Sequence, residues 1–68
     1  MPIQTIKIDK SFIREINSSD DDKAIVKATI SMASNLNIDI IAEGVENIEQ
    51  VKILRRFGCQ YFQGYYFS

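Results

Sequence analysis

Histidine is absent from this chain of 68 residues, and cysteine occurs once. Because histidine is the commonest general base and metal ligand, its absence argues against a zinc site of the Cys/His type. The single cysteine, Cys59, cannot form a disulfide within the chain, which is typical of proteins in a reducing compartment. Without a histidine to activate its thiol, we interpret Cys59 as a small buried apolar residue rather than as a nucleophile.

Long apolar runs and an excess of charge of one sign are also missing. The formal net charge is −1, from eight basic and nine acidic residues. This balance argues against a nucleic-acid polymer or an anionic membrane surface as a partner. No apolar run reaches the roughly 18 residues that cross a membrane, so we expect neither a signal peptide nor membrane contact from this segment. The hydrophobic content of 46% is nevertheless typical of a globular chain.

Strands and helices are predicted to alternate along the chain. Period-two alternation predicts a strand over residues 3–9, and an aliphatic run predicts a second over 38–42 with both faces covered. Aromatic residues predict a third strand over 59–67, with Gly64 marking a bend or a close approach. The helices between them are predicted over residues 10–16, 21–36 and 48–57. This order predicts an α/β fold of the type βαβαβ, with parallel strands and right-handed crossovers.

The ends of the two longer helices carry specific signals. Three consecutive aspartates at 20–22 could suggest a metal site, but the ligand spacing of a calcium loop does not follow them. We therefore interpret this polar stretch as a helix start, with one side chain as N-cap. Asn47 and Gln50 have the spacing of a capping box, and Asn37 and Gly58 suit the left-handed end of a helix.

The helix predicted over 21–36 has apolar residues at helical spacing, which we expect to form its buried face. The members of this face are Ile25, Ala28, Thr29, Met32, Ala33 and Leu36, widened by Val26 and Ile30. The helix predicted over 48–57 is expected to bury Val51, Leu54 and Phe57.

The second strand ends in an acidic turn, Glu43-Gly44-Val45-Glu46. Glycine permits a sharp turn or a close approach, and two carboxylates beside it can bind a metal, move protons or hold a base edge. The alternative is an ordinary turn between a strand and a helix, with acids that are solvated or cap the next helix.

Side-chain alternation predicts that Lys7, Glu43 and Gln63 share one face of the sheet at the carboxyl ends of the strands. The opposite face is apolar and suits the covering helices. In open α/β sheets and in (β/α)8 barrels this edge holds ligands and catalytic groups. These three residues are therefore candidate site residues, although ordinary strand-end residues in contact with water would show the same pattern.

Four segments resemble the C-terminal part of an EAL domain, the bacterial phosphodiesterase family that cleaves cyclic di-GMP. They are Ile-Lys-Ile-Asp-Lys-Ser-Phe-Ile (6–13), Ala-Ile-Val-Lys-Ala (24–28), Ile-Ala-Glu-Gly-Val-Glu (41–46) and Gln-Gly-Tyr-Tyr-Phe-Ser (63–68). The resemblance covers the whole chain and implies that residues 1–68 are the C-terminal portion of one incomplete EAL domain. The implied fold is the last three parallel strands and covering helices of a (β/α)8-barrel-like domain.

The resemblance implies hydrolysis of one phosphodiester bond of cyclic di-GMP to give linear pGpG, with Mg²⁺ or Mn²⁺ as cofactor. Lys7, Glu43 and Gln63 match the family's catalytic positions. Lys7 would orient the attacking water and offset phosphate charge, and Glu43 would act on metal-bound water, as a ligand through water or as a general base. Gln63 would form hydrogen bonds in the same centre. For substrate binding, Glu46 would meet a guanine edge or hold the turn, and Gly44 would allow the backbone to approach.

Most of the family's metal ligands have no match here, because the Glu-Ala-Leu strand, an asparagine, a later glutamate and the paired aspartates would lie upstream of Met1. We therefore expect this fragment alone to bind no metal and to be inactive. The alternative is part of a non-catalytic EAL-like module that binds cyclic di-GMP or a protein partner. A cut barrel leaves open sheet edges, so we expect self-association. The implied location is the bacterial cytoplasm, including the cytoplasmic part of a larger membrane-anchored or multidomain protein.

Overall fold

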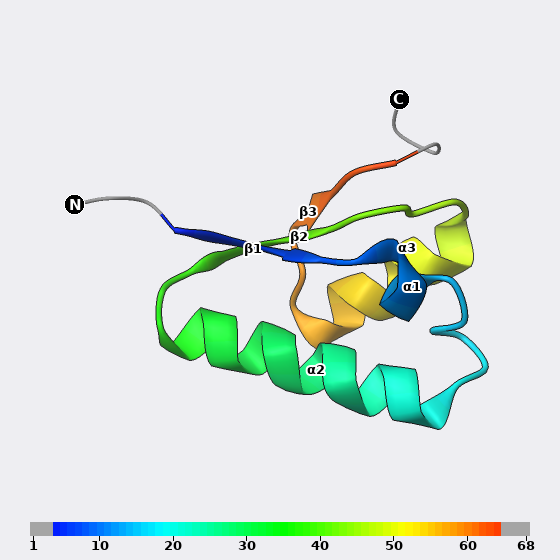
Figure 1. Cartoon of the computed structure of the whole chain (residues 1–68), viewed down its shortest axis with the longest axis horizontal. Coiled ribbons are helices and arrows are strands. Elements are labelled where there is room, and N and C mark those ends of the chain that lie inside the picture. Colours follow the sequence, from blue (N-terminus) through cyan, green and yellow to red (C-terminus); the bar gives the residue numbers. More distant parts are fainter. Residues whose placement is uncertain (1–3, 65–68) are drawn as a thin grey trace.

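The computed structural model describes residues 4–64. Its three strands form one parallel sheet in the order β1-β2-β3. Helices α2 and α3 lie on the same side of this sheet, and α1 lies beside the ends of the strands (Figure 1). The elements are β1 (Thr5–Ile8), α1 (Lys10–Ile13), α2 (Asp20–Asn35), β2 (Asp39–Ala42), α3 (Ile48–Phe57) and β3 (Tyr61–Phe62). The predicted α/β order of alternating strands and helices is confirmed.

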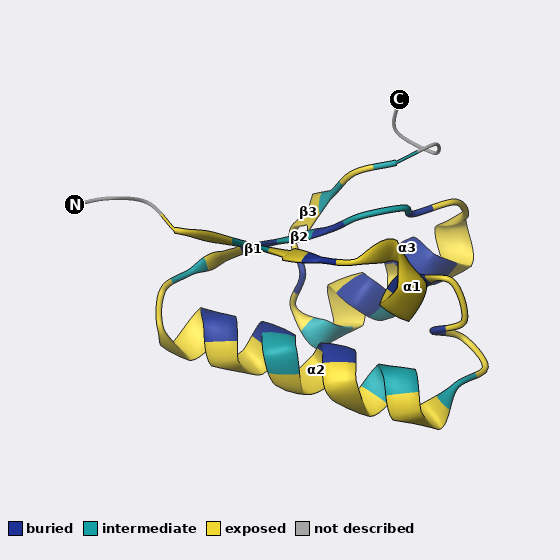
Figure 2. Ribbon diagram, viewed as in Figure 1, coloured by how far each residue is buried: buried dark blue, intermediate teal, exposed yellow. Residues whose placement is uncertain are grey.

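The two faces of the sheet differ as the alternation predicts. Ile8, Ile40 and Ala42 point toward the helices and are buried, whereas Lys7 and Tyr61 on the other face are exposed (Figure 2). In-register pairing of β1 with β2 and of β2 with β3 keeps each face continuous across the sheet. One face is therefore the core face, and the other carries the polar strand-end residues.

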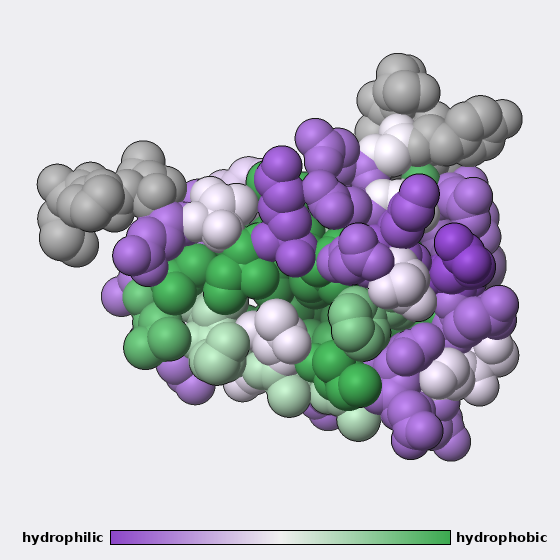
Figure 3. Space-filling view, viewed as in Figure 1, coloured by the Kyte–Doolittle hydropathy of each residue, from purple (hydrophilic) through white to green (hydrophobic). Residues whose placement is uncertain are grey.

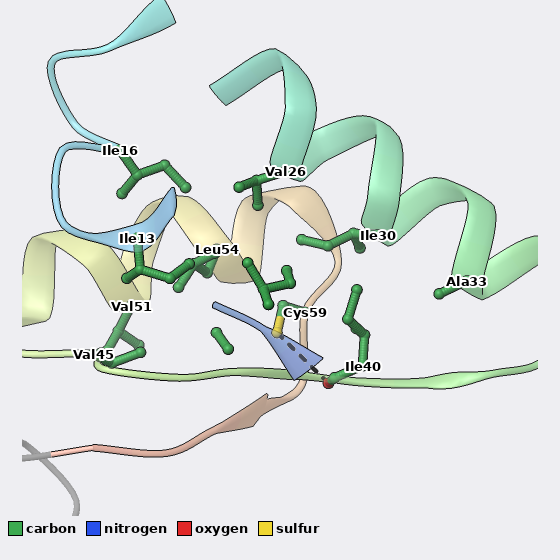
Figure 4. Close-up of a cluster of buried hydrophobic side chains, with 12 residues drawn as sticks. Ile13, Ile16, Val26, Ile30, Ala33, Ile40, Val45, Val51, Leu54 and Cys59 are labelled. Atoms are coloured by element: carbon green, nitrogen blue, oxygen red, sulfur yellow. Dashed lines mark hydrogen bonds between the residues drawn. The ribbon is translucent and has the colours of Figure 1, made fainter. Parts of the chain in front are cut away.

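The core lies between the sheet and the helices (Figure 4). Each of the longer elements contributes at least one buried side chain, among them Ile8, Ile13, Val26, Ile40 and Leu54. On the side shown in Figure 3, apolar side chains reach the surface between the edge strand β1 and α2. The helices thus cover the apolar core on one side, and the core reaches the surface along the edge strand β1.

The predicted buried face of α2 is wrong in most of its members. Ile25, Met32 and Leu36 are 48%, 50% and 61% exposed, whereas Val26 and Ile30 are buried. Ala33 is buried as predicted, Ala28 is exposed and Thr29 is half-buried. Two apolar stripes run side by side along this helix, and the sheet covers only the one through Val26, Ile30 and Ala33. In α3, Val51 and Leu54 are buried as predicted and Phe57 is half-buried.

Some predicted boundaries are also too long. The first helix ends at Ile13 rather than at residue 16, because the chain then continues in turns. In one of them, Ile16 N–H donates to the Ile13 carbonyl at 3.2 Å. β3 covers two residues, since Cys59 N–H donates to the Leu54 carbonyl of α3 and not to a strand. Residues 1–3 and 65–68, which include parts of the predicted first and third strands, lie outside the described residues.

The predicted helix ends are confirmed. The Ser19 hydroxyl caps α2 by accepting from the Asp22 N–H at 3.1 Å, so the three aspartates occupy the first turn of a helix. Asn47 and Gln50 form the predicted capping box of α3. Asn37 and Gly58 have φ values of 58° and 105°, in the left-handed region.

Candidate active site

The candidate residues lie where the strands end, and alternation along the strands directs their side chains to the face of the sheet turned away from α2 and α3. Lys7 is in β1, Glu43 directly follows β2 and Gln63 directly follows β3. Glu43 N–H donates to the Ile8 carbonyl at 3.1 Å, and Gln63 N–H donates to the Ala42 carbonyl at 2.8 Å. These bonds extend the strand ladder by one residue and so fix the backbone at Glu43 and Gln63. The prediction of a shared face is confirmed for Lys7 and Glu43 by their ion pair, whereas for the Gln63 side chain it stays a prediction.

Lys7 and Glu43 form an ion pair in which Nζ and Oε2 are 3.9 Å apart. Lys7 pairs in register with Ile41, which precedes Glu43 by two residues, so the long side chain of Lys7 extends toward the carboxyl end of β2 to meet the Glu43 carboxylate. The two side chains are 59% and 32% exposed, which limits such a pair to about 1 kcal/mol or less. The strands therefore bring these two side chains together, and the ion pair adds little.

Gly44 allows the acidic turn to pack directly against α1. Its φ is +69°, and a Cβ at this position would collide with Cβ of Lys10 and approach its Cα to 3.3 Å. The close approach expected of this glycine is thus an approach to Lys10, three residues beyond Lys7. The turn after β2 and the segment after β1 form one packed unit.

Gly64 joins the third strand end to the same unit. A Cβ at Gly64 would lie 2.7 Å from N and 2.8 Å from O of Val45, closer than a side chain can approach. Beside it, Val45 N–H donates to the Gln63 carbonyl at 3.2 Å. The close approach that the sequence predicts at Gly64 is confirmed, and it ties the turn after β3 to the turn after β2.

Glu46 is exposed, and its backbone is held from below by Gln50. Glu46 N–H donates to Oε1 of Gln50 at 2.6 Å, and Gln50 itself is 2% exposed. Its Nε2 donates to the Ile13 carbonyl at 3.3 Å, which crosses from α3 to the end of α1. The capping-box spacing predicts the role of Gln50 in α3, but no local pattern predicts a partner 37 positions away.

Asp9 directly follows β1, two residues after Lys7, but its carboxylate is engaged by α1. It is the N-cap of α1 and accepts from Ser11 N–H at 3.0 Å. The hydrogen bonds from Ser11 lower the pKa of Asp9 below its ordinary value. Asp9 therefore stabilises the start of α1 and stays ionised.

Carboxylates do not gather into a metal site within residues 4–64. No group of three or more histidine, cysteine, aspartate or glutamate residues in this range could hold a metal ion. Asp20, Asp21 and Asp22 belong to the first turn of α2. A divalent metal at the strand ends would find the Glu43 carboxylate here and would need its other ligands from elsewhere.

An open pocket of about 350 Å³ lies at the opposite end of the sheet. Its lining includes Asn37, Asp39, Gln60 and Tyr61, near the start of β2 and β3. Because the candidate residues lie where the strands end, this hollow is separate from them.

The sequence profile of the EAL domain family matches residues 1–68. The chain belongs to the EAL domain family. The predicted resemblance is therefore confirmed over the whole chain. None of the helices among the described residues of this EAL chain is long and apolar enough to cross a membrane.

Relatives and solved structures agree with this assignment. The chain is 43% identical over 68 residues to the cyclic di-GMP phosphodiesterase NbdA of Pseudomonas aeruginosa, of which it spans 9%. The EAL enzyme Bd1971, solved with cAMP and cyclic di-GMP bound, is 43% identical with a TM-score of 0.93. The match covers 100% of this chain and 18% of Bd1971. The fold is thus part of the TIM-barrel-like EAL architecture.

BlrP1 of Klebsiella pneumoniae links the family to divalent metals. It is 35% identical with a TM-score of 0.88, and the match covers 91% of this chain and 16% of BlrP1. Its structures hold manganese or calcium together with cyclic di-GMP. In BlrP1, a divalent metal thus accompanies the nucleotide.

Proposed function

We propose that residues 1–68 are the C-terminal portion of one EAL domain that hydrolyses cyclic di-GMP to linear pGpG. The observation that carries this proposal is the Lys7–Glu43 ion pair at the strand ends, with Gln63 following the neighbouring strand. The 43% identity to the cyclic di-GMP phosphodiesterase NbdA supports the same chemistry. The buried free thiol of Cys59 suits a reducing compartment, and we place this domain in the bacterial cytoplasm.

Each of the three residues has a role that fits its chemistry. The ammonium group of Lys7 offsets charge on the phosphate and orients the attacking water. The carboxylate of Glu43 takes a proton from that water while oxygen bonds to phosphorus. The bond from phosphorus to the leaving ribose oxygen then breaks, and this oxygen takes a proton from solvent. The Gln63 amide holds the phosphate or the water by hydrogen bonds.

Substrate recognition is assigned to the turn that follows Glu43. The exposed carboxylate of Glu46 can accept hydrogen bonds from the guanine edge, and Gly44 shapes the turn that carries Glu46 by packing against Lys10. Mg²⁺ or Mn²⁺, held mainly by carboxylates outside this chain and met by Glu43 through water, would neutralise charge on the phosphoryl oxygens. The 68-residue chain by itself is therefore expected to bind no metal tightly and to leave cyclic di-GMP intact.

The test completes the domain around this chain. The 68 residues replace the corresponding segment of NbdA, and the resulting protein, called the graft, is incubated with cyclic di-GMP and Mg²⁺ or Mn²⁺. We expect linear pGpG to form, and none to form with the isolated chain. A graft that is folded and binds the nucleotide but does not cleave it would favour the non-catalytic binding module instead. Turnover by the isolated chain would contradict the proposal that it lacks the metal ligands.

A further inference from the structure

We propose that Gln50 is a positioning residue for the reaction. It holds the turn from Glu43 to Glu46 against the end of α1, through hydrogen bonds on both sides of its buried amide. This inference rests on the function proposed above for Glu43 and Glu46, and it assigns to Gln50 a task beyond capping α3.

The amide of Gln50 contacts two separate segments of backbone. Its Oε1 accepts from Glu46 N–H at 2.6 Å and from Asn47 N–H at 3.3 Å. Its Nε2 donates to the Ile13 carbonyl at 3.3 Å. Both polar atoms of the amide are thus engaged, Oε1 by the acidic turn and Nε2 by α1, the helix that follows β1.

A capping box alone does not account for this arrangement. Capping requires the contact with Asn47, together with the bond from Gln50 N–H to the Asn47 Oδ1 at 2.9 Å. It requires neither the shorter bond to Glu46 nor the bond to Ile13, and it works equally well at an exposed position. Gln50 is 2% exposed, and an amide is costly to bury unless its polar atoms find partners. The burial and the additional partners indicate a tie between segments.

The position of this tie connects it to the proposed chemistry. Lys7 lies in β1, just before α1, and Glu43 is the first residue of the turn, so the tie joins the two segments that carry the ion pair. Ile13 and Val45, one from each of the tied segments, are buried in the same core as Val51, the neighbour of Gln50 in α3 (Figure 4). Gly44 packs on Lys10 at the start of α1. Gln50 therefore fixes the direction of the turn together with the close packing of Gly44.

Two variants of the graft separate the contacts of the amide. Gln50→Met keeps a similar length and removes the acceptor and the donor. Gln50→Glu keeps the acceptor for Glu46 and Asn47 but places an oxygen against the Ile13 carbonyl. The control is Val26→Ala, a buried change in α2, to which Gln50 forms none of these hydrogen bonds, compared at a temperature where all variants are folded.

We expect Gln50→Met to lower kcat about tenfold or more, because small misplacements of catalytic groups have large effects on rate. Hydrogen exchange at the Glu46 amide should become about tenfold faster, whereas exchange in α2 stays unchanged. Val26→Ala should leave kcat within about twofold of the graft. For Gln50→Glu, kcat relative to the graft should rise as pH falls, since a protonated carboxyl again donates to Ile13.

Equal kcat for the Met variant and the Val26 control, or an unchanged Glu46 exchange rate, would overturn the proposal. A pH-independent ratio for Gln50→Glu would overturn the part played by Ile13. If the unsubstituted graft does not cleave cyclic di-GMP, the proposed function fails by itself. Exchange at Glu46 and the Kd for cyclic di-GMP then decide the role of Gln50, and unchanged values in Gln50→Met would reject it.

Discussion

Lys7 and Glu43 owe their positions to the backbone rather than to their mutual attraction. Their ion pair is 3.9 Å long and partly open to water, so the loss of either charge should have little effect on folding. Gly44 is under a stronger constraint, because the turn leaves no room for a side chain beside Lys10. At the scale of single residues, close packing of glycine backbone holds the site more firmly than charge does.

Gly44→Ala tests this constraint. The new methyl group meets Lys10 and the backbone has φ of +69°, so we expect a loss of about 1–3 kcal/mol in the free energy of unfolding. The measurement is urea denaturation of the graft, with the same change repeated in a Lys10→Gly background. There the loss should be smaller, because the collision with Lys10 Cβ is gone. An equal loss in both backgrounds would show that Lys10 is not the obstacle.

Cys59 gives a prediction about pH. Burial raises the pKa of the Cys59 thiol above its ordinary value, so the unfolded chain loses this proton first as pH rises. The contribution of the neutral thiol is complete below the unfolded pKa of about 8.5 and is lost above it. The free energy of unfolding is measured by urea denaturation of the graft across the pH range. Above this pH we expect it to fall more steeply in the unsubstituted graft than in Cys59→Ala. Parallel curves would contradict a buried neutral thiol.

At the scale of elements, the sequence predicts helix ends better than helix faces. A cap depends on residues three or four apart, so Ser19 and Asn47 act within their own neighbourhood. The buried stripe of α2 depends on where the sheet lies, and apolar residues such as Ile25 and Ile30 offer two neighbouring stripes. Either stripe alone indicates a helix by its periodicity. Only the packed structure shows which of the two the sheet covers.

Ile30 and Ile25 provide a matched pair of variants on this helix. Ile30 is 2% exposed and Ile25 is 48% exposed. We expect Ile30→Ala to lower the free energy of unfolding by about 2–4 kcal/mol, because it leaves a cavity in the core. Ile25→Ala should lower it by less than about 1 kcal/mol. Chemical denaturation of the graft measures both, and similar losses would mean that the assignment of the buried stripe is wrong.

At the scale of the whole molecule, the sequence predicts which face of the sheet carries the candidate site. It does not predict which distant segments pack against each other there. Alternation along each strand places Lys7, Glu43 and Gln63 on one face, since parallel in-register strands keep side-chain direction. The contacts of Gly64 with Val45 and of Gln50 with Ile13 join residues far apart in sequence. No local pattern carries that information.

The open sheet leads to a prediction about assembly. β1 and β3 are edge strands in the described sheet, and Tyr61 is 49% exposed on the face opposite the helices. We propose that the isolated 68-residue chain associates with itself through these surfaces, because unpaired strand edges invite pairing. Light scattering should show a mass that rises with concentration, and Thr5→Pro in β1 should reduce it. A monodisperse monomer at high concentration would contradict this proposal.

The rate of hydrolysis in the graft carrying Glu43→Gln tests the central claim most directly. Its matched control is Glu49→Gln, the same change at an exposed glutamate in the first turn of α3. If Glu43 takes the proton from the attacking water, kcat should fall by about 10²-fold or more, with the fold intact by circular dichroism. Glu49→Gln should stay within about twofold. A Glu43→Gln graft that cleaves cyclic di-GMP as fast as the Glu49→Gln control would contradict the proposed catalytic role of Glu43.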